Sequence, residues 1–296
     1  MTFRAPLVLH APAKINLSLE ITGRRASGYH DVATVMQTVD LCDELSFEPS
    51  AELELECDGP SISTEDNLVI RAARALQRAT DTYSGARIRL SKSIPLAAGL
   101  GGGSSDAAAT LLGLCRLWNL AIAPPVLSTI TASIGADVSF FLRGGLAIAT
   151  GIGEIVEWLP DPTPRFVLLC TPEQGPVNKT VAAYRSLKES DFSDGAATHA
   201  IGRAFLDGTI GRDPWDFVTS GRNAFERAAD DLYLSVPGAR NAMLAAGAPW
   251  VRLSGAGPSL YSLFDSQEAA AVVARQLEDG LKTHVVQTRP SDRHRA

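Results

Sequence analysis

Residues 95–105 read Pro95-Leu96-Ala97-Ala98-Gly99-Leu100-Gly101-Gly102-Gly103-Ser104-Ser105. This segment joins a predicted strand, residues 86–90, to an alanine- and leucine-rich helix predicted to run to about Trp118. Glycine permits a positive φ and lets backbone N–H groups approach an anion without a Cβ clash. The unpaired N–H groups and the dipole of the following helix add positive charge at the same place. Residues 95–105, the glycine loop below, therefore predict a phosphate-binding segment rather than a simple turn.

Other common glycine motifs do not fit this loop. A Walker loop needs a lysine after its last glycine, and none follows Gly103. The dinucleotide pattern G-x-G-x-x-G fails at its sixth place, which holds Ser104 or Asp106 depending on the starting glycine. The H-R-D and D-F-G elements of protein kinases and the G-x-S-x-G elbow of serine hydrolases are absent from the sequence.

The N-terminal part of the chain alternates strands and helices around this loop. Ile15, Leu17 and Leu19 alternate with polar residues, which predicts a strand with Lys14 and Asn16 on its opposite face. A strand is predicted at 53–57, and a helix at 67–79 with Asp66 as its cap. A second helix is expected at 125–134, ending at Gly135, and a hairpin at 145–158.

The chain is predicted to form two α+β domains, residues 1–160 and 161–296. Three prolines between residues 159 and 164 mark the linker. After it come a strand at 166–170, several helices, strands near 250–253 and 260–264, a further helix, and a last strand at 284–287.

Composition narrows the function classes. The chain has 296 residues, 45% hydrophobic and 20% charged, so it can bury a core. A net charge of −6 argues against sequence-independent nucleic-acid binding. The four cysteines are scattered without a C-x-x-C pair, which predicts reduced thiols in the cytoplasm rather than a zinc site. No targeting segment and no run long enough to span a membrane is expected.

Three segments resemble the GHMP kinase superfamily in the family's own order: residues 11–17, the glycine loop and residues 253–259. The resemblance implies an N-terminal domain like the second domain of ribosomal protein S5, which holds ATP, and a ferredoxin-like C-terminal domain. It also implies a substrate in the cleft between them. The implied reaction is direct phosphoryl transfer assisted by Mg²⁺, with ATP and Mg²⁺ as cofactors.

Further residues resemble the branch of the superfamily whose substrate is a cytidine-diphosphate-linked alcohol: Gly28-Tyr29-His30, residues 36–38, 66–69 and 135–138. Ser27 departs from that branch, which usually has Asp before Gly-Tyr-His. Homoserine- or mevalonate-type kinases are the rivals within the superfamily. A non-catalytic nucleotide- or RNA-binding module is the rival from another class. A monomer and a homodimer are both compatible with the sequence.

The resemblance also assigns catalytic roles. By position alone, Asp137 is a helix N-cap, but the resemblance implies the base that accepts the substrate's hydroxyl proton. Lys14 is implied to keep Asp137 ionised and to neutralise developing charge, with Asn16 as a substrate or network residue. The metal ligands stay unassigned. Ser104 and Ser105 are each compatible with helix capping, phosphate contact or Mg²⁺ ligation, and Asp106 is unexpected beside a phosphate site.

The same resemblance places the cytosine end of the substrate. Tyr29 is implied to stack on the base and His30 to hydrogen-bond its edge. Tyr184 is a candidate second aromatic wall, and Thr180 a candidate substrate contact. The residues implied to hold the nucleotide are Pro95, Leu96, Ala97, Ala98, Gly99, Leu100, Gly101, Gly102, Gly103, Ser104 and Ser105.

Overall fold

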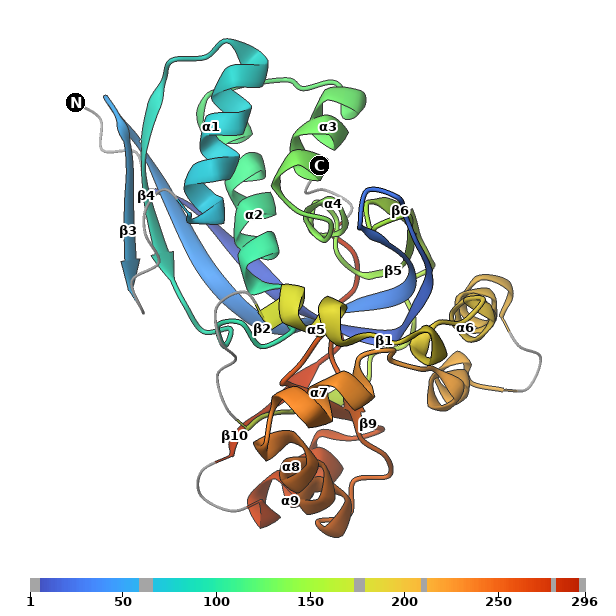
Figure 1. Ribbon diagram of the computed structural model, residues 1–296. Coiled ribbons are helices and arrows are strands. Elements are labelled where there is room, and N and C mark those ends of the chain that lie inside the picture. Colours follow the sequence, from blue (N-terminus) through green and yellow to red (C-terminus); the bar gives the residue numbers. More distant parts are fainter. Residues whose placement is uncertain (1–5, 59–65, 173–178, 209–211, 278–280, 293–296) are drawn as a thin grey trace.

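Two long antiparallel strands run through the computed structural model, which describes residues 6–58, 66–172, 179–208, 212–277 and 281–292 (Figure 1). Strand β1 spans Leu7–Arg24 and pairs along its length with β2, His30–Ser50. The register shifts between Pro12 and Lys14 and again between Asn16 and Ser18. These irregularities frame the segment that carries the two polar residues predicted to share a face.

The larger sheet has six strands in the described chain. They are β1, β2, β3 (Leu53–Asp58), β4 (Gly85–Ser91), β5 (Leu146–Thr150) and β6 (Ile155–Trp158). The order is β3-β4-β2-β5-β6, with β1 paired to β2 on its other edge. Four helices pack together against this sheet (Figure 1): α1 (Leu68–Thr80), α2 (Gly102–Leu117), α3 (Pro124–Ile134) and α4 (Val138–Phe141).

Close packing places α2 directly on the sheet. A Cβ added at Gly113 would stand 2.5 Å from the ring of Phe47 on β2, so this helix position requires glycine. Glycine inside a helix costs about 1 kcal/mol relative to alanine. Here that cost is offset by burial of the Phe47 ring, which is 1% exposed. The result is a fixed position for α2 and for the glycine loop at its start.

The smaller sheet belongs to the C-terminal part. It comprises β7 (Phe166–Thr171), β8 (Arg252–Leu253), β9 (Leu260–Phe264) and β10 (Lys282–Gln287), in the order β10-β7-β9-β8. The helices of this part are α5 (Lys179–Ser186), α6 (Ala196–Asp207), α7 (Glu226–Leu232), α8 (Ser235–Ala245) and α9 (Gln267–Gln276). Short 3₁₀ helices span Glu189–Asp191 and Pro214–Ser220. The two sheets with their helices confirm the predicted α+β class.

Strand β1 is packed on both sides. Ala11 belongs to the core beneath α1–α4, whereas Ile15 and Leu17 pack with Val167 and Tyr261 of the smaller sheet. The chain passes from one sheet to the other between β6 and β7, where the prolines lie. The division into domains at residue 160 stays a prediction.

Two expectations from sequence need correction. Asn67, not Asp66, caps α1: its side chain accepts a hydrogen bond from the backbone N–H of Val69 at 3.0 Å. Strand β2 had no counterpart among the expected elements, because residues 32–39 are buried throughout and show no alternation. In the described part of the chain, no helix has the length and apolar character needed to cross a membrane.

Candidate functional site

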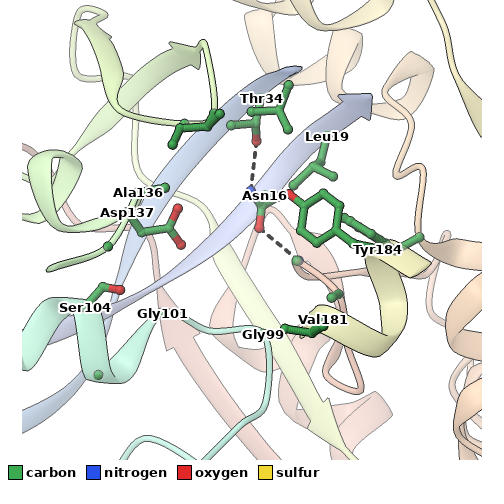
Figure 2. A pocket seen from close by; sticks show the side chains of 18 of the residues that line it. Asn16, Leu19, Thr34, Gly99, Gly101, Ser104, Ala136, Asp137, Val181 and Tyr184 are labelled. Carbon is green, nitrogen blue, oxygen red and sulfur yellow. Dashed lines mark hydrogen bonds between the residues drawn. The ribbon is translucent and has the colours of Figure 1, made fainter. Parts of the chain in front are cut away.

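A cleft of about 1270 Å³ lies between the glycine loop, β1, the start of α4 and α5. Residues 95–104 line one side, and Tyr184 and Phe192 from the C-terminal part line another. Figure 2 shows Asp137 and Tyr184 on either side of Asn16 in this cleft. The structure therefore brings most of the predicted site residues to one cavity: Lys14, Asn16, Tyr29, His30, residues 95–104, Asp137 and Tyr184.

The shape of the glycine loop is set by close contacts. Gly99 and Gly101 have φ values of 80° and 72°. A Cβ at Gly99 would stand 2.1 Å from the carbonyl oxygen of Ser254, and one at Gly101 would stand 2.8 Å from the Phe141 ring. Gly102, by contrast, does not have a positive φ, and its Cβ would point at Ile94. The left-handed conformation that favours glycine is thus needed at Gly99 and Gly101.

The two serines at the start of α2 occupy different places. Ser104 lines the cleft, whereas Ser105 is 1% exposed and does not line it. Gly101 is the N-cap of α2, and no side-chain capping bond forms there in the described chain. The Ser105 hydroxyl has no hydrogen-bond partner among the described residues. Of the two, Ser104 is placed to meet a ligand.

Lys14 is buried in the cleft wall, with 4% of its surface exposed. Its Nζ donates to Asn16 Oδ1 at 2.5 Å and lies 3.7 Å from Asp137 Oδ2. Burial lowers the pKa of Lys14 from its ordinary value, and the opposing charge and hydrogen bonding of Asp137 limit that shift. Its backbone N–H donates to Leu100 O at 2.9 Å, which ties β1 to the glycine loop.

Asn16 links three parts of the site. Its Oδ1 accepts from Lys14 and from the backbone N–H of Gly255 at 2.9 Å. Its Nδ2 donates to Thr34 Oγ1 on β2 at 2.8 Å (Figure 2). Tyr261 donates through its hydroxyl to the Asn16 backbone carbonyl at 2.9 Å. In this structure Asn16 acts as a network residue that connects the lysine to the C-terminal part.

Asp137 is the N-cap residue of α4, as its position in the sequence suggests. Its side chain makes no capping hydrogen bond in the described chain, so the carboxylate is free to face the cleft, where Figure 2 shows it. About a third of the side chain, 34%, is exposed. A partly solvated carboxylate beside a buried ammonium is suited to accept a proton from a bound alcohol.

An aromatic group lies at the opposite side of the cleft. The rings of His30 and Tyr184 stack with centroids 5.1 Å apart, and Phe192 contacts His30 edge-on at 5.8 Å. Phe225 packs edge-on against Tyr184 at 4.9 Å. Tyr29 is 62% exposed where it lines the cleft. Tyr184 therefore packs on His30, and the sequence analysis did not find Phe192 or Phe225.

Burial shifts the pKa values of the two titrating residues in this aromatic group, His30 and Tyr184. Burial lowers the pKa of His30 from its ordinary value, and the nearby positive charge of Arg24 lowers it further. Burial, reinforced by the charge of Asp137, raises the pKa of Tyr184 to about 12. His30 is therefore neutral at pH 7, with one ring nitrogen as donor and the other as acceptor. Thr180 lies in α5, but its side chain falls outside the described part of the structure.

A second buried lysine sits behind the glycine loop. Lys92 Nζ donates to Asp106 Oδ2 at 2.7 Å and to Asp43 Oδ2. The resulting Asp43–Lys92–Asp106 cluster explains why an acidic residue can lie next to a predicted phosphate site: the Lys92 ammonium lies beside Asp106 and offsets its charge. Burial raises the pKa of Asp106 to about 7 against the opposing effect of Lys92. Neither Asp43 nor Lys92 was predicted as part of the site.

The described residues contain no group of three or more His, Cys, Asp or Glu side chains arranged to hold a metal ion. In many phosphoryl-transfer sites Mg²⁺ is held by only one or two protein oxygens, which share the ion with phosphates and water. The oxygens of Ser104 and Asp137, both in the cleft lining, can fill that role.

Comparisons with family models and with known proteins all indicate the same family. The model of the GHMP kinases N terminal domain matches residues 67–145, and that of the GHMP kinases C terminal domain matches 216–283. A Dehalococcoides mccartyi protein named 4-diphosphocytidyl-2-C-methyl-D-erythritol kinase is 36% identical over 284 residues, covering 95% of this chain and 98% of that protein.

Solved structures agree. A crystal structure of a 4-(cytidine 5'-diphospho)-2C-methyl-D-erythritol kinase is 33% identical, with a TM-score of 0.77 over 95% of this chain and 99% of the other. A homoserine kinase from Cytophaga hutchinsonii has a TM-score of 0.72 at 18% identity over 98% of this chain and 96% of the other, which shows a shared fold alone.

The raised pKa of Asp106 makes a prediction about stability. In the unfolded chain this carboxyl ionises near pH 4, whereas in the folded protein it keeps its proton up to about pH 7. The folded protein is therefore penalised as pH rises from 4 to 7, and the penalty is complete above 7. Asp106→Asn removes this pH-dependent penalty, so we expect the melting temperature of the variant relative to wild type to be higher at pH 8 than at pH 5, whatever the constant cost of losing the Lys92 contact.

The measurement is a thermal melt of nucleotide-free wild type and variant at both pH values. Asp58→Asn is the control, since Asp58 is exposed and hydrogen bonds lower its pKa. A melting difference for Asp106→Asn that is the same at pH 5 and pH 8 would contradict the raised pKa.

Proposed function

The chain belongs to the GHMP kinases, ATP-dependent kinases of small molecules, and we propose that its substrate is 4-diphosphocytidyl-2-C-methyl-D-erythritol. In this proposal the 2-hydroxyl is phosphorylated, a step of the non-mevalonate route to isoprenoid precursors. The observation that carries it is full-length similarity to kinases of that name, at 36% identity over 95% of the chain. The aromatic group around His30 adds support from the cleft itself.

We propose that Asp137 orients the substrate hydroxyl and accepts its proton. The hydroxyl oxygen forms a bond to the γ-phosphorus, the bond from that phosphorus to the bridging oxygen breaks, and ADP leaves. Such transfers depend more on positioning and charge stabilisation than on a strong base. Asp137 meets that requirement because Lys14 Nζ stands 3.7 Å from its carboxylate.

Lys14 would interact both with the proposed base, Asp137, and with the phosphoryl group that is transferred. Its ammonium lies 3.7 Å from the Asp137 carboxylate and offsets negative charge that builds on the transferring phosphoryl group. Asn16 holds Nζ in place through the 2.5 Å hydrogen bond. A preorganised charge costs no reorganisation when the transition state forms, which is why a fixed lysine is more effective than a mobile one.

The glycine loop would hold the ATP phosphates through its backbone N–H groups and the start of α2. Mg²⁺ would neutralise charge on the phosphates when bound, with Ser104 and Asp137 as candidate protein oxygens. The cleft lies between the parts that we propose as domains, residues 1–160 and 161–296, because both contribute to its lining.

We assign cytosine recognition to His30, with Tyr29 and Tyr184 as its aromatic neighbours. A neutral histidine offers one donor and one acceptor, and the cytosine edge offers an amino donor beside a ring-nitrogen acceptor. Stacking on an aromatic face contributes about 1–3 kcal/mol per base but tolerates any base, so discrimination falls to the hydrogen bonds. This binding energy, remote from the reacting hydroxyl, can be used to orient it.

Two arginines are available for the substrate's diphosphate. Arg24 is paired across the strands with His30, and Arg185 follows Tyr184 on α5. Both line the cleft. The two lysines that line the cleft are already paired, Lys14 with Asp137 and Lys92 with two carboxylates.

A substrate panel tests the proposed function. Purified protein with Mg²⁺ and ATP is offered the cytidylated substrate, free methylerythritol phosphate, homoserine and mevalonate, and ADP release is followed. We expect turnover with the cytidylated alcohol and at least about a hundredfold lower kcat/KM with the others. Equal use of methylerythritol phosphate would reject cytidine recognition, and preference for homoserine or mevalonate would assign the chain to another branch.

Replacement of the proposed base is the first mutational prediction. Asp137→Asn keeps the size of the side chain and should lower kcat by about 10²–10⁴ while ATP affinity and melting temperature stay close to wild type. Asp161→Asn, outside the cleft, is the matched control. Turnover within a few-fold of wild type would remove Asp137 from the mechanism.

The second mutational prediction concerns recognition of the cytosine base by His30. His30→Ala should raise the KM for the cytidylated substrate by about tenfold, the scale of one lost hydrogen bond together with packing. The KM for ATP should stay unchanged, as should both KM values in the control His10→Ala, which lies outside the cleft. An equal rise of both KM values would mean that His30 supports the cleft as a whole.

A further inference from the structure

We propose that Asp43, which lies outside the cleft lining, is a positioning residue for nucleotide binding that anchors both ends of the glycine loop. It is completely buried on β2, opposite Ala11 of β1. The inference rests on the proposed role of the glycine loop in holding ATP and does not depend on which alcohol is phosphorylated.

The first anchor lies where the chain enters the loop. Asp43 Oδ1 accepts hydrogen bonds from the backbone N–H groups of Ser93 at 2.6 Å and Ile94 at 2.8 Å. These residues directly precede Pro95, the first residue of the loop. One carboxylate oxygen therefore fixes the backbone that leaves β4 against the interior of the larger sheet.

The second anchor lies where the chain leaves the loop. The other carboxylate oxygen, Oδ2, accepts from Lys92 Nζ, and the same ammonium donates to Asp106 Oδ2 at 2.7 Å. Asp106 sits at the start of α2, and the Lys92 side chain is 9% exposed. Asp43 thus reaches the beginning of α2 through a single buried lysine.

The charge balance argues for a positioning role. Two acidic side chains around one ammonium do not form a cationic site for phosphate, whether or not Asp106 carries its proton, so electrostatic attraction alone does not explain the cluster. Burial acts to lower the pKa of Lys92, but Asp106 and Asp43 together raise it above its ordinary value, which keeps the lysine charged. A charged lysine held on both sides is a rigid link between β2 and α2.

Rigidity matters here because of the composition of the loop. Glycine loses more conformational freedom on ordering than any other residue, and the loop has four glycines within residues 99–103. If both ends are already fixed, less of that freedom remains to be lost when phosphate binds. The affinity for nucleotide is then higher without a new contact to the ligand.

The test compares two Asp43 variants with a matched buried acid. Asp43→Ala removes both anchors, whereas Asp43→Asn keeps an oxygen that can accept from Ser93 and Ile94. The control is Glu20→Gln: Glu20 is 2% exposed on β1 and accepts from Ser193 Oγ at 2.8 Å and Thr198 N at 2.7 Å. Affinity for a non-hydrolysable ATP analogue with Mg²⁺ is measured by calorimetry, together with melting temperature and kcat at saturating ATP.

We expect Asp43→Ala to weaken nucleotide binding by about tenfold or more, the scale of lost hydrogen bonds to a charged group. Asp43→Asn should weaken it by about threefold, since the charge of the link to Lys92 is lost but the backbone anchor is kept. Glu20→Gln should leave affinity unchanged even if it lowers the melting temperature. In both Asp43 variants kcat at saturating ATP should stay within about threefold of wild type, because the catalytic pair is untouched.

Affinity within twofold of wild type in folded Asp43→Ala would overturn the proposal, as would an equal loss of affinity in Glu20→Gln. Should Asp43→Ala fail to fold, Asp43→Asn decides: weakened binding supports the anchor and unchanged binding overturns it. If wild type itself binds no nucleotide, the failure lies with the role of the glycine loop and not with Asp43.

Discussion

The side chain of Asn16 is the constraint on which the geometry of the site depends. One oxygen accepts from both Lys14 and Gly255, and the amide nitrogen donates to Thr34. Among common side chains of this size, an amide can accept twice and donate at once, whereas a carboxylate would lose the donor and add a buried charge. Lys14 is held near Asp137 because Asn16 holds Lys14. The C-terminal part is joined to the same point through the backbone of Gly255.

Strand β1 can hold these polar side chains in place because residues 11–21 are buried on both faces of the strand. Its apolar residues Ile15 and Leu17 pack toward the smaller sheet, and its polar residues between positions 14 and 20 lie in protein rather than in water. Each of these polar groups has a partner: Ser18 bonds Thr198, and Glu20 accepts from Thr198 and Ser193. A buried polar group without a partner would cost about 1–3 kcal/mol. The strand therefore holds these polar side chains in fixed positions, because each has a hydrogen-bond partner in the folded protein.

The elements that sequence predicts well are those whose pattern is local. The alternation from Ile15 onward predicted that Lys14 and Asn16 share one face of a strand, and the glycines predicted where α2 begins. The first half of β2 was not predicted because residues 32–39 are buried on both faces, so they show no alternation. The cap of α1 was misplaced by one residue because Asp66 and Asn67 are equally good caps by type.

Contacts between distant segments left no local signal. Asp43 and Lys92 are 49 residues apart, and each alone resembles a surface charge in the sequence. Phe192 and Phe225 reach the cleft through the folding of the C-terminal part, and nothing in their neighbourhoods distinguishes them from core residues. Local pattern was therefore enough to predict the glycine loop and the strand that carries Lys14 and Asn16, whereas the contacts of Asp43 and Lys92 and the positions of Phe192 and Phe225 required the fold.

A crystal structure of the ternary complex with the cytidylated alcohol and a non-hydrolysable ATP analogue tests the account most directly. The account predicts the nucleotide phosphates on the glycine loop, the cytosine edge within hydrogen-bond reach of His30, and the 2-hydroxyl oxygen about 3 Å from an Asp137 carboxylate oxygen. A cytosine bound away from His30, or a hydroxyl out of reach of Asp137 in a closed complex, would contradict it.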